Sequence, residues 1–276
     1  MEKEKLEQSK HIVQSKVEEV NPYAVVLMFS GGDDSLAALA AADYLGIKID
    51  YILHGNTRTG IRQTTDFARE TAKRFDAKYI EADAGNDYEK YVLRKGFFGR
   101  GMTAHSYAYH VLKIGHFRKA VSKHIRQRKR NRTILFLNGA RMNESENRKK
   151  NLKVYREDPS QPKNIWVNII HYWEDSDKWN MLDLTGLKRN PVSKKLCRSG
   201  ECMCGTTQSM EEGQEAAYWY PEWGKSWKDL RKKVMKKFPW DWGQEINKYH
   251  HLETKGQINM FQPMCHSCTK DQSCEV

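Results

Sequence analysis

The pattern of hydrophobic and polar positions divides much of the chain into short segments of two kinds. Apolar runs that predict strands lie at residues 24–29, 47–54, 77–82, 133–140 and 165–173. Apolar residues at helical spacing lie before or between them, at residues 2–20, 34–45, 61–75 and about 106–127. Strands that alternate with helices favour right-handed crossovers and a largely parallel sheet. We therefore predict an α/β fold.

The same pattern predicts three regions. Residues 1–20 are expected to form an amphipathic helix that ends at an Asn-Pro pair, and residues 21–189 the α/β domain. Within this domain, residues 85–106 are rich in glycine and are expected to be a mobile loop over a site, and residues 156–164 a polar loop. The periodicity then decays, so residues 190–276 are expected to be a Cys-rich C-terminal extension with shorter helices.

Charge and hydropathy narrow the class of protein. The 276-residue chain has 47 basic and 35 acidic residues and a formal net charge of +12. This excess favours an anionic partner, which is either a nucleic acid or a nucleotide. No run approaches the roughly 18 apolar residues that a membrane span needs, and the charged N-terminus is unlike a signal peptide. We therefore expect a cytoplasmic protein that does not contact a membrane.

The segment FSGGDDS joins a predicted strand to a predicted helix. A helix start exposes unpaired backbone N–H groups and the positive end of the helix dipole, so it suits phosphate. Glycine lets a ligand approach the backbone, and serine adds a hydroxyl donor. The residues of this candidate phosphate cradle are Ser30, Gly31, Gly32, Asp33, Asp34 and Ser35. The segment lacks the lysine of an ordinary P-loop, and the alternative is a plain strand-to-helix turn.

Three segments together resemble one protein family. SGGDDS resembles the SGGxDS signature of PP-loop ATP pyrophosphatases, which the phosphoadenosine phosphosulfate (PAPS) reductase family shares. NGARMNESENR is similar to that family's G-x-R-x-x-E-S-x-x-R segment, and its matching residues are Gly139, Arg141, Glu144, Ser145 and Arg148. Residues 168–205 are similar to a family segment with a strand, W-x-x-x-D-V-W, N-P and G-C-x-x-C in order. The matching residues there are Trp173, Asp177, Trp179, Asn190 and Pro191.

This resemblance implies a fold and a ligand. The fold is a parallel five-stranded Rossmann-like sheet of the adenine nucleotide alpha-hydrolase-like type, with helices on both faces. Residues 30–35 are expected to bind ATP with Mg²⁺, or a sulfonucleotide, either PAPS or adenosine phosphosulfate (APS). The guanidinium groups at 138–148 suit phosphate or sulfate oxygens. Catalytic roles are expected for Ser30, Asp34, Ser35 and Arg141, and nucleotide binding for residues 30–35 and the matching residues of 138–148.

The end of the second predicted strand, LHGNTRTG, is a candidate adenosine pocket. The resemblance implies that this region faces the nucleotide, so that His54, Asn56 and Thr57 bond adenine or ribose. The alternative is a plain turn with a helix-capping threonine, because Asn, Thr and Gly are common turn and cap residues.

The six cysteines form two clusters after residue 196. Cys197, Cys202 and Cys204 have the spacing C-x4-C-x-C, and Cys265, Cys268 and Cys274 the spacing C-x2-C-x5-C. Such clusters suit tetrahedral Zn²⁺ or an iron–sulfur cluster, and the resemblance favours [4Fe-4S]. The close pairs, Cys202 with Cys204 and Cys265 with Cys268, are the expected ligands. Cys197 is an alternative to one of them.

The last cysteine, Cys274, is either a ligand or a reactive thiol. Sulfite-forming reductases of the family end in E-C-G-x-H, whereas this chain ends in QSCEV. It also has Cys-Met-Cys where cluster-bearing reductases have adjacent cysteines. Both departures argue against reductase activity.

Basic segments favour nucleic acid as a further partner. Residues 116–132 contain eight Lys/Arg and no acidic residue, and residues 218–242 interleave Lys and Arg with aromatic residues. The alternative for both is a solvated helix face.

Three functions remain open. The first is an ATP pyrophosphatase in sulfur modification of DNA or RNA, similar to the DNA phosphorothioation proteins of the family, with a cysteine desulfurase as sulfur donor. The second is a PAPS or APS reductase in which Cys274 attacks sulfur and a thioredoxin-like donor releases sulfite. The third is a nucleotide-binding module without turnover.

Overall fold

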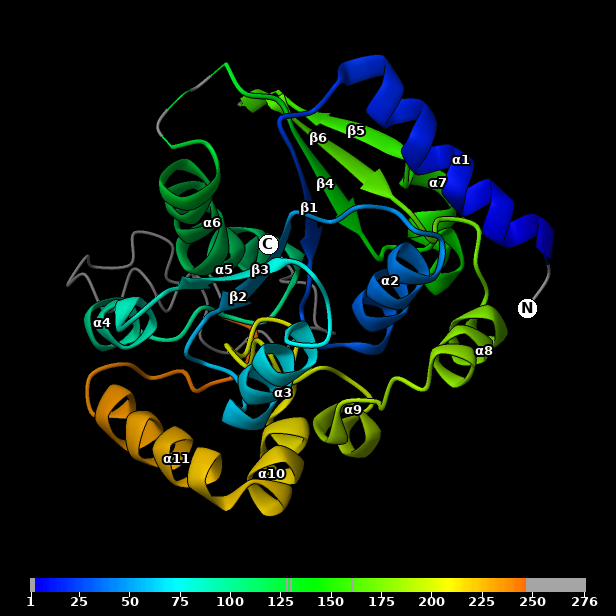
Figure 1. Cartoon of the computed structure of the whole chain (residues 1–276). Helices are drawn as coiled ribbons and strands as arrows, with labels where there is room; N and C mark the ends of the chain where they lie inside the picture. Colours follow the sequence, from blue (N-terminus) through cyan, green and yellow to red (C-terminus); the bar gives the residue numbers. More distant parts are fainter. Residues whose placement is uncertain (1–2, 128, 130, 160, 247–276) are drawn as a thin grey trace, which may run out of the picture.

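A single sheet organises the computed structural model, which describes residues 3–127, 129, 131–159 and 161–246 (Figure 1). Its strand order is β3-β2-β1-β4-β6-β5. Five strands are parallel, and β5 is antiparallel to β6. The strands are β1 (Ala24–Met28), β2 (Tyr51–Asn56), β3 (Lys78–Asp83), β4 (Ile134–Asn138), β5 (Tyr155–Asp158) and β6 (Gln161–Asn168). The expected α/β, Rossmann-like fold is therefore confirmed, with one antiparallel edge strand in addition.

Helices cover both faces of this sheet. One face is covered by α1 (Lys3–Val20), α2 (Asp33–Tyr44), α3 (Arg62–Ala72) and α8 (Asp175–Thr185). The other face is covered by one long helix made of α5 (Met102–Tyr109), η1 (His110–Ile114), α6 (Gly115–Ala120) and η2 (Val121–Ile125), in which η1 and η2 are π-helical. The remaining helices are α4 (Asp87–Lys95), η3 (Met142–Glu144), α7 (Glu146–Asn151), α9 (Pro191–Leu196), α10 (Met210–Trp219) and α11 (Pro221–Met235).

The central strand β1 shows why both faces are covered. Val25 and Leu27 pack in the cluster with α1 and α2, whereas Ala24 and Val26 pack in the cluster with α6 and η2. Successive side chains of a strand point to opposite faces. A strand that is buried on both faces has a continuous apolar sequence. The run AVVLM therefore predicts a strand of this kind.

The structure corrects two of the expected loops. Residues 156–164 are largely β5 and β6 rather than a polar loop. Arg156 and Glu157 are exposed on the edge strand β5, so its sequence lacks the apolar alternation that predicts a strand. Likewise, residues 85–106 contain α4, because Tyr88 and Val92 are buried one helical turn apart. The expected loop is therefore only partly a loop.

The C-terminal region has a hydrophobic cluster of its own. Its tryptophans Trp227, Trp240 and Trp242 are buried and pack with residues of α4 and η1, among them Val92 and Leu112. These aromatic side chains of 218–242 are therefore core residues rather than stacking platforms for bases. No helix among the described residues is long and apolar enough to span a membrane.

Candidate nucleotide site and cysteine pair

The turn between β1 and α2 is held by its own hydroxyl groups. The Ser30 and Ser35 hydroxyl oxygens are 3.0 Å apart, and the Ser35 hydroxyl donates to the Gly32 carbonyl across 2.9 Å. The Gly32 N–H donates to the Ser30 hydroxyl across 3.3 Å. Gly31 has φ +76°, a conformation that favours glycine, and a Cβ there would lie 2.9 Å from the Thr64 methyl carbon. The two serines and two glycines thus form one compact turn at the start of α2.

Three cationic side chains gather on the carboxylates of this turn. Arg189 pairs with Asp33 through two contacts of 3.0 and 2.7 Å. Arg141 Nε lies 2.8 Å from Asp34 Oδ1, and Lys178 Nζ lies 3.4 Å from the same oxygen. Because Lys178 also pairs with Asp175, the three cations are balanced by three carboxylates. A polyanionic ligand at this helix N-terminus would therefore compete with the carboxylates for the same cations.

Arg141 is buried at the end of β4. Its guanidinium also lies 2.8 Å from Asp175 and only 4% of the residue is exposed. Burial alone would lower the pKa of Arg141, but Asp34 and Asp175 raise it above its usual value. Gly139 lies two positions before Arg141. A Cβ on Gly139 would lie 2.5 Å from the Asp34 carbonyl oxygen. Only glycine therefore lets β4 approach the start of α2 this closely.

The other matched residues of 138–148 stabilise their own segment. Glu144 accepts a hydrogen bond from the Arg141 N–H across 2.9 Å and forms an ion pair with Arg148. The Ser145 hydroxyl accepts from the Arg148 N–H across 3.2 Å and caps α7. Direct nucleotide contacts of Glu144, Ser145 and Arg148 stay a prediction.

The predicted adenosine residues have internal partners. His54 is fully buried, with Nδ1 2.8 Å from the Phe29 carbonyl oxygen, and burial lowers the pKa of His54 below its usual value. The Thr57 hydroxyl donates to the Glu201 carbonyl across 2.9 Å, and the Asn56 amide donates to Glu81 across 2.8 Å. These hydrogen bonds fix the side chains of His54, Asn56 and Thr57 to neighbouring segments. Their contact with adenine or ribose stays a prediction.

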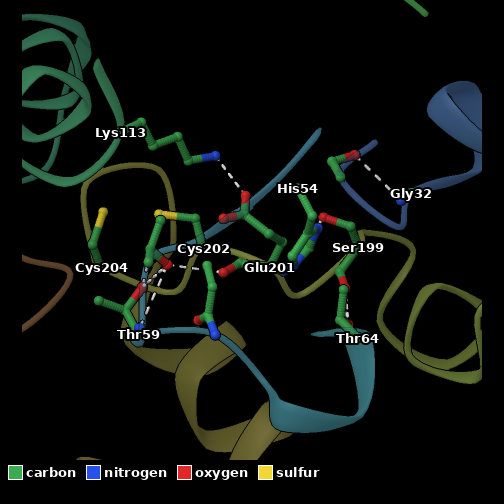
Figure 2. A network of polar contacts seen from close by, with 12 residues as sticks. Gly32, His54, Thr59, Thr64, Lys113, Ser199, Glu201, Cys202 and Cys204 are labelled. Atoms are coloured by element: carbon green, nitrogen blue, oxygen red, sulfur yellow. Dashed lines mark hydrogen bonds and ion pairs between the residues drawn. The ribbon is translucent and has the colours of Figure 1, made fainter. Parts of the chain in front are cut away.

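The segment that carries two cysteines lies against residues 30–35 (Figure 2). This turn between β1 and α2 is called the phosphate turn after the ligand predicted for it. A Cβ on Gly32 would lie 3.3 Å from the Ser199 Cβ. Ser199 accepts a hydrogen bond from the Thr64 hydroxyl, and the Ile61 N–H donates to the Gly200 carbonyl across 2.8 Å. The candidate nucleotide site and the cysteine segment are thus neighbours in one structure.

Cys202 and Cys204 form a close pair with the character of metal ligands. Cys204 is 3% exposed, and its sulfur lies 3.3 Å from the Thr206 hydroxyl. The neighbouring Cys202 thiol lowers the pKa of Cys204, while Cys204 and burial raise the pKa of Cys202 well above its usual value. A thiolate is the form that binds metal.

Of the rest of the predicted ligand set, the structure describes only Cys197. Cys197 is exposed at the end of α9, and Cys265, Cys268 and Cys274 lie outside the described residues. Within the part of the chain that the structure describes, no three His, Cys, Asp or Glu side chains are placed to hold one metal ion. The pair therefore fits half of a four-cysteine site.

Residues 24–208 match the family model described as the phosphoadenosine phosphosulfate reductase domain. The chain belongs to this family. The match contains the turn, Arg141 and the Cys202–Cys204 pair, so the contacts of the candidate site fall inside the family's domain. The comparison with curated proteins gave no match.

Several solved structures are similar to the chain. They include a PAPS reductase from Candida auris in complex with phosphate, with 13% identity, TM-score 0.48 and coverage of 70% of this chain and 92% of that one. An NH3-dependent NAD synthetase from Campylobacter jejuni has 15% identity, TM-score 0.46 and coverage of 93% of both chains. A U34-tRNA thiolase from Methanococcus maripaludis with its [4Fe-4S] cluster has 12% identity, TM-score 0.42 and coverage of 94% and 89%.

Several site residues of this family member were missed by sequence reasoning. Arg189 directly precedes the Asn-Pro pair that carries the resemblance, and Lys178 directly follows the matched Asp177, so both had a local signal. Lys113 and Glu201 had none. They form a buried ion pair beside Cys202 (Figure 2). Burial alone would lower the pKa of Lys113, but Glu201 raises it above its usual value.

Proposed function

We propose that this PAPS reductase family member is an ATP pyrophosphatase that adenylates an acceptor oxygen during sulfur modification of nucleic acid. The observation that carries this proposal is the convergence of Arg141, Lys178 and Arg189 on Asp33 and Asp34 at the start of α2. These cations, together with the backbone of the Ser30–Ser35 turn, suit the several charges of a triphosphate.

The proposed chemistry has two steps. A nucleic-acid oxygen attacks the α-phosphorus of ATP, the bond to the β-phosphate oxygen breaks, and pyrophosphate leaves with Mg²⁺. In the second step, a persulfide sulfur from a donor of the cysteine desulfurase type attacks the adenylated atom, and AMP leaves with the electron pair of the broken bond. A dithiol reductant then cleaves the S–S bond that still joins donor and acceptor, so that the sulfur stays on the nucleic acid and the dithiol becomes a disulfide. Ser30, Ser35 and Asp34 position the triphosphate and its metal, and Arg141 neutralises charge, which are the usual demands of such transfers.

A metal group completes the proposal at the Cys202–Cys204 pair. Cys202 and Cys204 would hold a [4Fe-4S] cluster, with Cys265 and Cys268 as the remaining ligands and Cys197 as the alternative to one of them. Such a cluster supplies electron transfer, whereas Zn²⁺ at the same cysteines supplies structure or Lewis acidity.

The second candidate function is PAPS or APS reduction. It is favoured by the family itself, and it requires Cys274 as the attacking thiol. The test is sulfite formation from a sulfonucleotide and a dithiol donor, which Cys274→Ser must abolish. Full activity of Cys274→Ser excludes this mechanism.

The proposed function is tested by pyrophosphate release. Anaerobically purified protein receives Mg-ATP, a DNA or RNA oligonucleotide and a persulfide donor. Ser35→Ala is expected to abolish release, because it removes the hydroxyl that joins Ser30 to the Gly32 carbonyl. Ser122→Ala, an exposed serine of η2, is the matched control and should leave release unchanged. Absence of release with every acceptor and donor would refute the proposal.

A further inference from the structure

A cavity of about 280 Å³ lies between the long helix and the sheet face formed by β4, β5 and β6. It begins beside Met28 and Leu53 and extends past Phe136 and Trp166. Its border is formed by Tyr109, His110, Phe117 and Arg118 on the helix and by Arg156, Glu157, Asp158, Pro159, Gln161 and Asn164 on the edge hairpin. None of residues 30–35 and neither Cys202 nor Cys204 lines it. The cavity is therefore separate from the phosphate turn, although Met28 precedes Ser30 by only two positions.

Aromatic rings form the wall on the strand side. Phe136 and Trp166 are stacked, with ring centroids 4.7 Å apart and an angle of 21° between the planes. The Arg156 guanidinium lies 5.4 Å from the Trp166 ring centroid. Phe136 and Arg156 are the registered neighbours of Trp166 on β4 and β5, so they flank its ring on both sides. A base therefore stacks on Trp166 where the exposed Arg156 side chain moves aside, or stacks on the Arg156 guanidinium itself.

The indole N–H of Trp166 adds a polar feature to this wall. Its nitrogen is buried, and it has no hydrogen-bond partner among the described residues. A buried donor without a partner costs free energy. A ligand with a ring nitrogen or carbonyl oxygen in the cavity offers the missing acceptor, and nucleobases carry both.

The helix that borders the cavity also carries exposed cations. Arg118 lines the cavity, and Lys119 and Lys123 are exposed on the same long helix. No acidic residue occurs between residues 116 and 132. A strand whose phosphates follow this helix face can therefore place a base in the cavity.

We propose that the cavity between the long helix and the edge hairpin binds one unpaired base of a nucleic-acid strand, stacked beside Trp166 and Arg156, while Lys119 and Lys123 hold the flanking phosphates. This proposal rests on the proposed function for the presence of a nucleic-acid acceptor. It adds the place where that acceptor binds, which lies beside the first strand and on the opposite face of the sheet from α2.

The test compares two strands and three variants by fluorescence anisotropy. One labelled oligonucleotide carries its bases, and the other has the same backbone with abasic positions. Trp166→Leu is expected to weaken binding of the first strand by at least about fivefold, because stacking contributes about 1–3 kcal/mol per base, and to leave the abasic strand unchanged. Lys123→Gln is expected to weaken both strands by the same factor, because it acts on phosphate.

A second variant guards against a folding defect. Arg156→Gln changes an exposed residue of the edge strand and should reproduce the base-selective loss at smaller size, with unchanged circular dichroism. Equal loss for both strands in Trp166→Leu and Arg156→Gln would overturn the proposal, as would failure of the wild type to distinguish the strands.

ATP binding, measured separately by calorimetry, distinguishes a strand site from a mononucleotide site. Unchanged ATP affinity in Trp166→Leu supports the proposal. A loss of ATP affinity with unchanged strand binding would assign the cavity to the nucleotide and overturn it. Ser35-dependent pyrophosphate release is a separate readout, so the base cavity can fail while the proposed function stands.

Discussion

The side-chain amide of Asn190 donates a hydrogen bond to the backbone carbonyl of Gly31 across 2.9 Å, although the two residues are 159 positions apart. The same nitrogen lies 3.2 Å from the Thr64 hydroxyl and 3.4 Å from the Ser199 carbonyl oxygen. Asn190 is fully buried. One side chain therefore joins the phosphate turn, α3 and the cysteine-bearing segment.

Asn190→Asp should destabilise the protein and weaken ATP binding. The substitution keeps the oxygen that accepts from the Val192 N–H but removes the donor to Gly31 and adds negative charge beside the phosphate turn. We expect a loss of about 1–3 kcal/mol in the free energy of unfolding, measured with urea, and a higher KM for ATP. Asn151→Asp, at an exposed amide pair on α7, should change stability by less than about 0.5 kcal/mol. Equal effects of the two substitutions would contradict the bridging role.

Gly139→Ala should impair the site through a steric effect alone. A Cβ at this position would lie 2.5 Å from the Asp34 carbonyl oxygen, so β4 or the start of α2 must shift. We expect pyrophosphate release to fall by at least about tenfold, since small displacements of positioning groups are costly. The control is Gly115→Ala, where a Cβ meets nothing within 4 Å and helix propensity predicts up to about 1 kcal/mol of stabilisation.

Arg141→Gln should lower kcat/KM for ATP far more than Asp175→Asn. Arg141 is buried and contacts Asp34 in the phosphate turn, whereas the Asp175 side chain is 73% exposed. We expect about a hundredfold loss for Arg141→Gln, the size seen when one charge-stabilising donor is removed. Asp175→Asn should cost less than about 1 kcal/mol of stability, because the pair is largely solvated. A comparable loss of kcat/KM in both variants would show that Arg141 acts only through Asp175.

His54 predicts a dependence of stability on pH. Burial lowers the pKa of His54 from its usual 6.5, so the unfolded chain takes up a proton that the folded chain refuses. The free energy of unfolding should therefore be highest above pH 6.5 and fall as the pH drops from there towards the folded-state pKa. His54→Asn should be less stable at pH 7.5 but show a shallower fall between pH 7 and 5.5 in urea titrations. An unchanged slope would mean that another group carries the dependence.

The cysteine pair predicts selective loss of metal. Under the proposed [4Fe-4S] site, anaerobically purified Cys204→Ser should contain much less iron and acid-labile sulfide than the wild type. Cys197→Ser is the informative comparison, because Cys197 is exposed on α9, and it should retain both. Zinc in place of iron in the wild type would select the alternative metal, and loss on Cys197→Ser would place that residue among the ligands.

Local sequence signals predicted the sheet and the phosphate turn. AVVLM is buried on both faces, and SGGDDS is followed at once by an alanine-rich helix, so strand, turn and helix each have their own signature. Gly139 and Arg141 were predicted from a second segment because the family pattern fixes both. The structure then brings Arg141 to Asp34 across 107 positions of sequence.

The features that sequence missed depend on tertiary contacts. Lys113 resembles any other lysine of a basic helix, and only the fold shows that Glu201 lies beside it. β5 is an exposed edge strand whose register is set by β6. That His54 and Thr57 contact the nucleotide stays a prediction, whereas their internal partners, the carbonyls of Phe29 and Glu201, are set by the fold.

The π-helical turns η1 and η2 control which way the basic surface faces. Each residue of an α-helix turns by about 100° around the axis, and a π-bulge behaves as one residue added to the α-helical repeat. If His110–Ile114 wound as an ordinary α-helix with all its residues kept, everything beyond it would therefore be rotated by roughly a quarter of a turn. Lys119 and Lys123 would then face another direction around the helix axis. Val121, now buried against the sheet, would turn away from it, and a polar residue next to it in the sequence would take its place. The winding of this helix thus aligns its charged side with solvent and its apolar side with the strands.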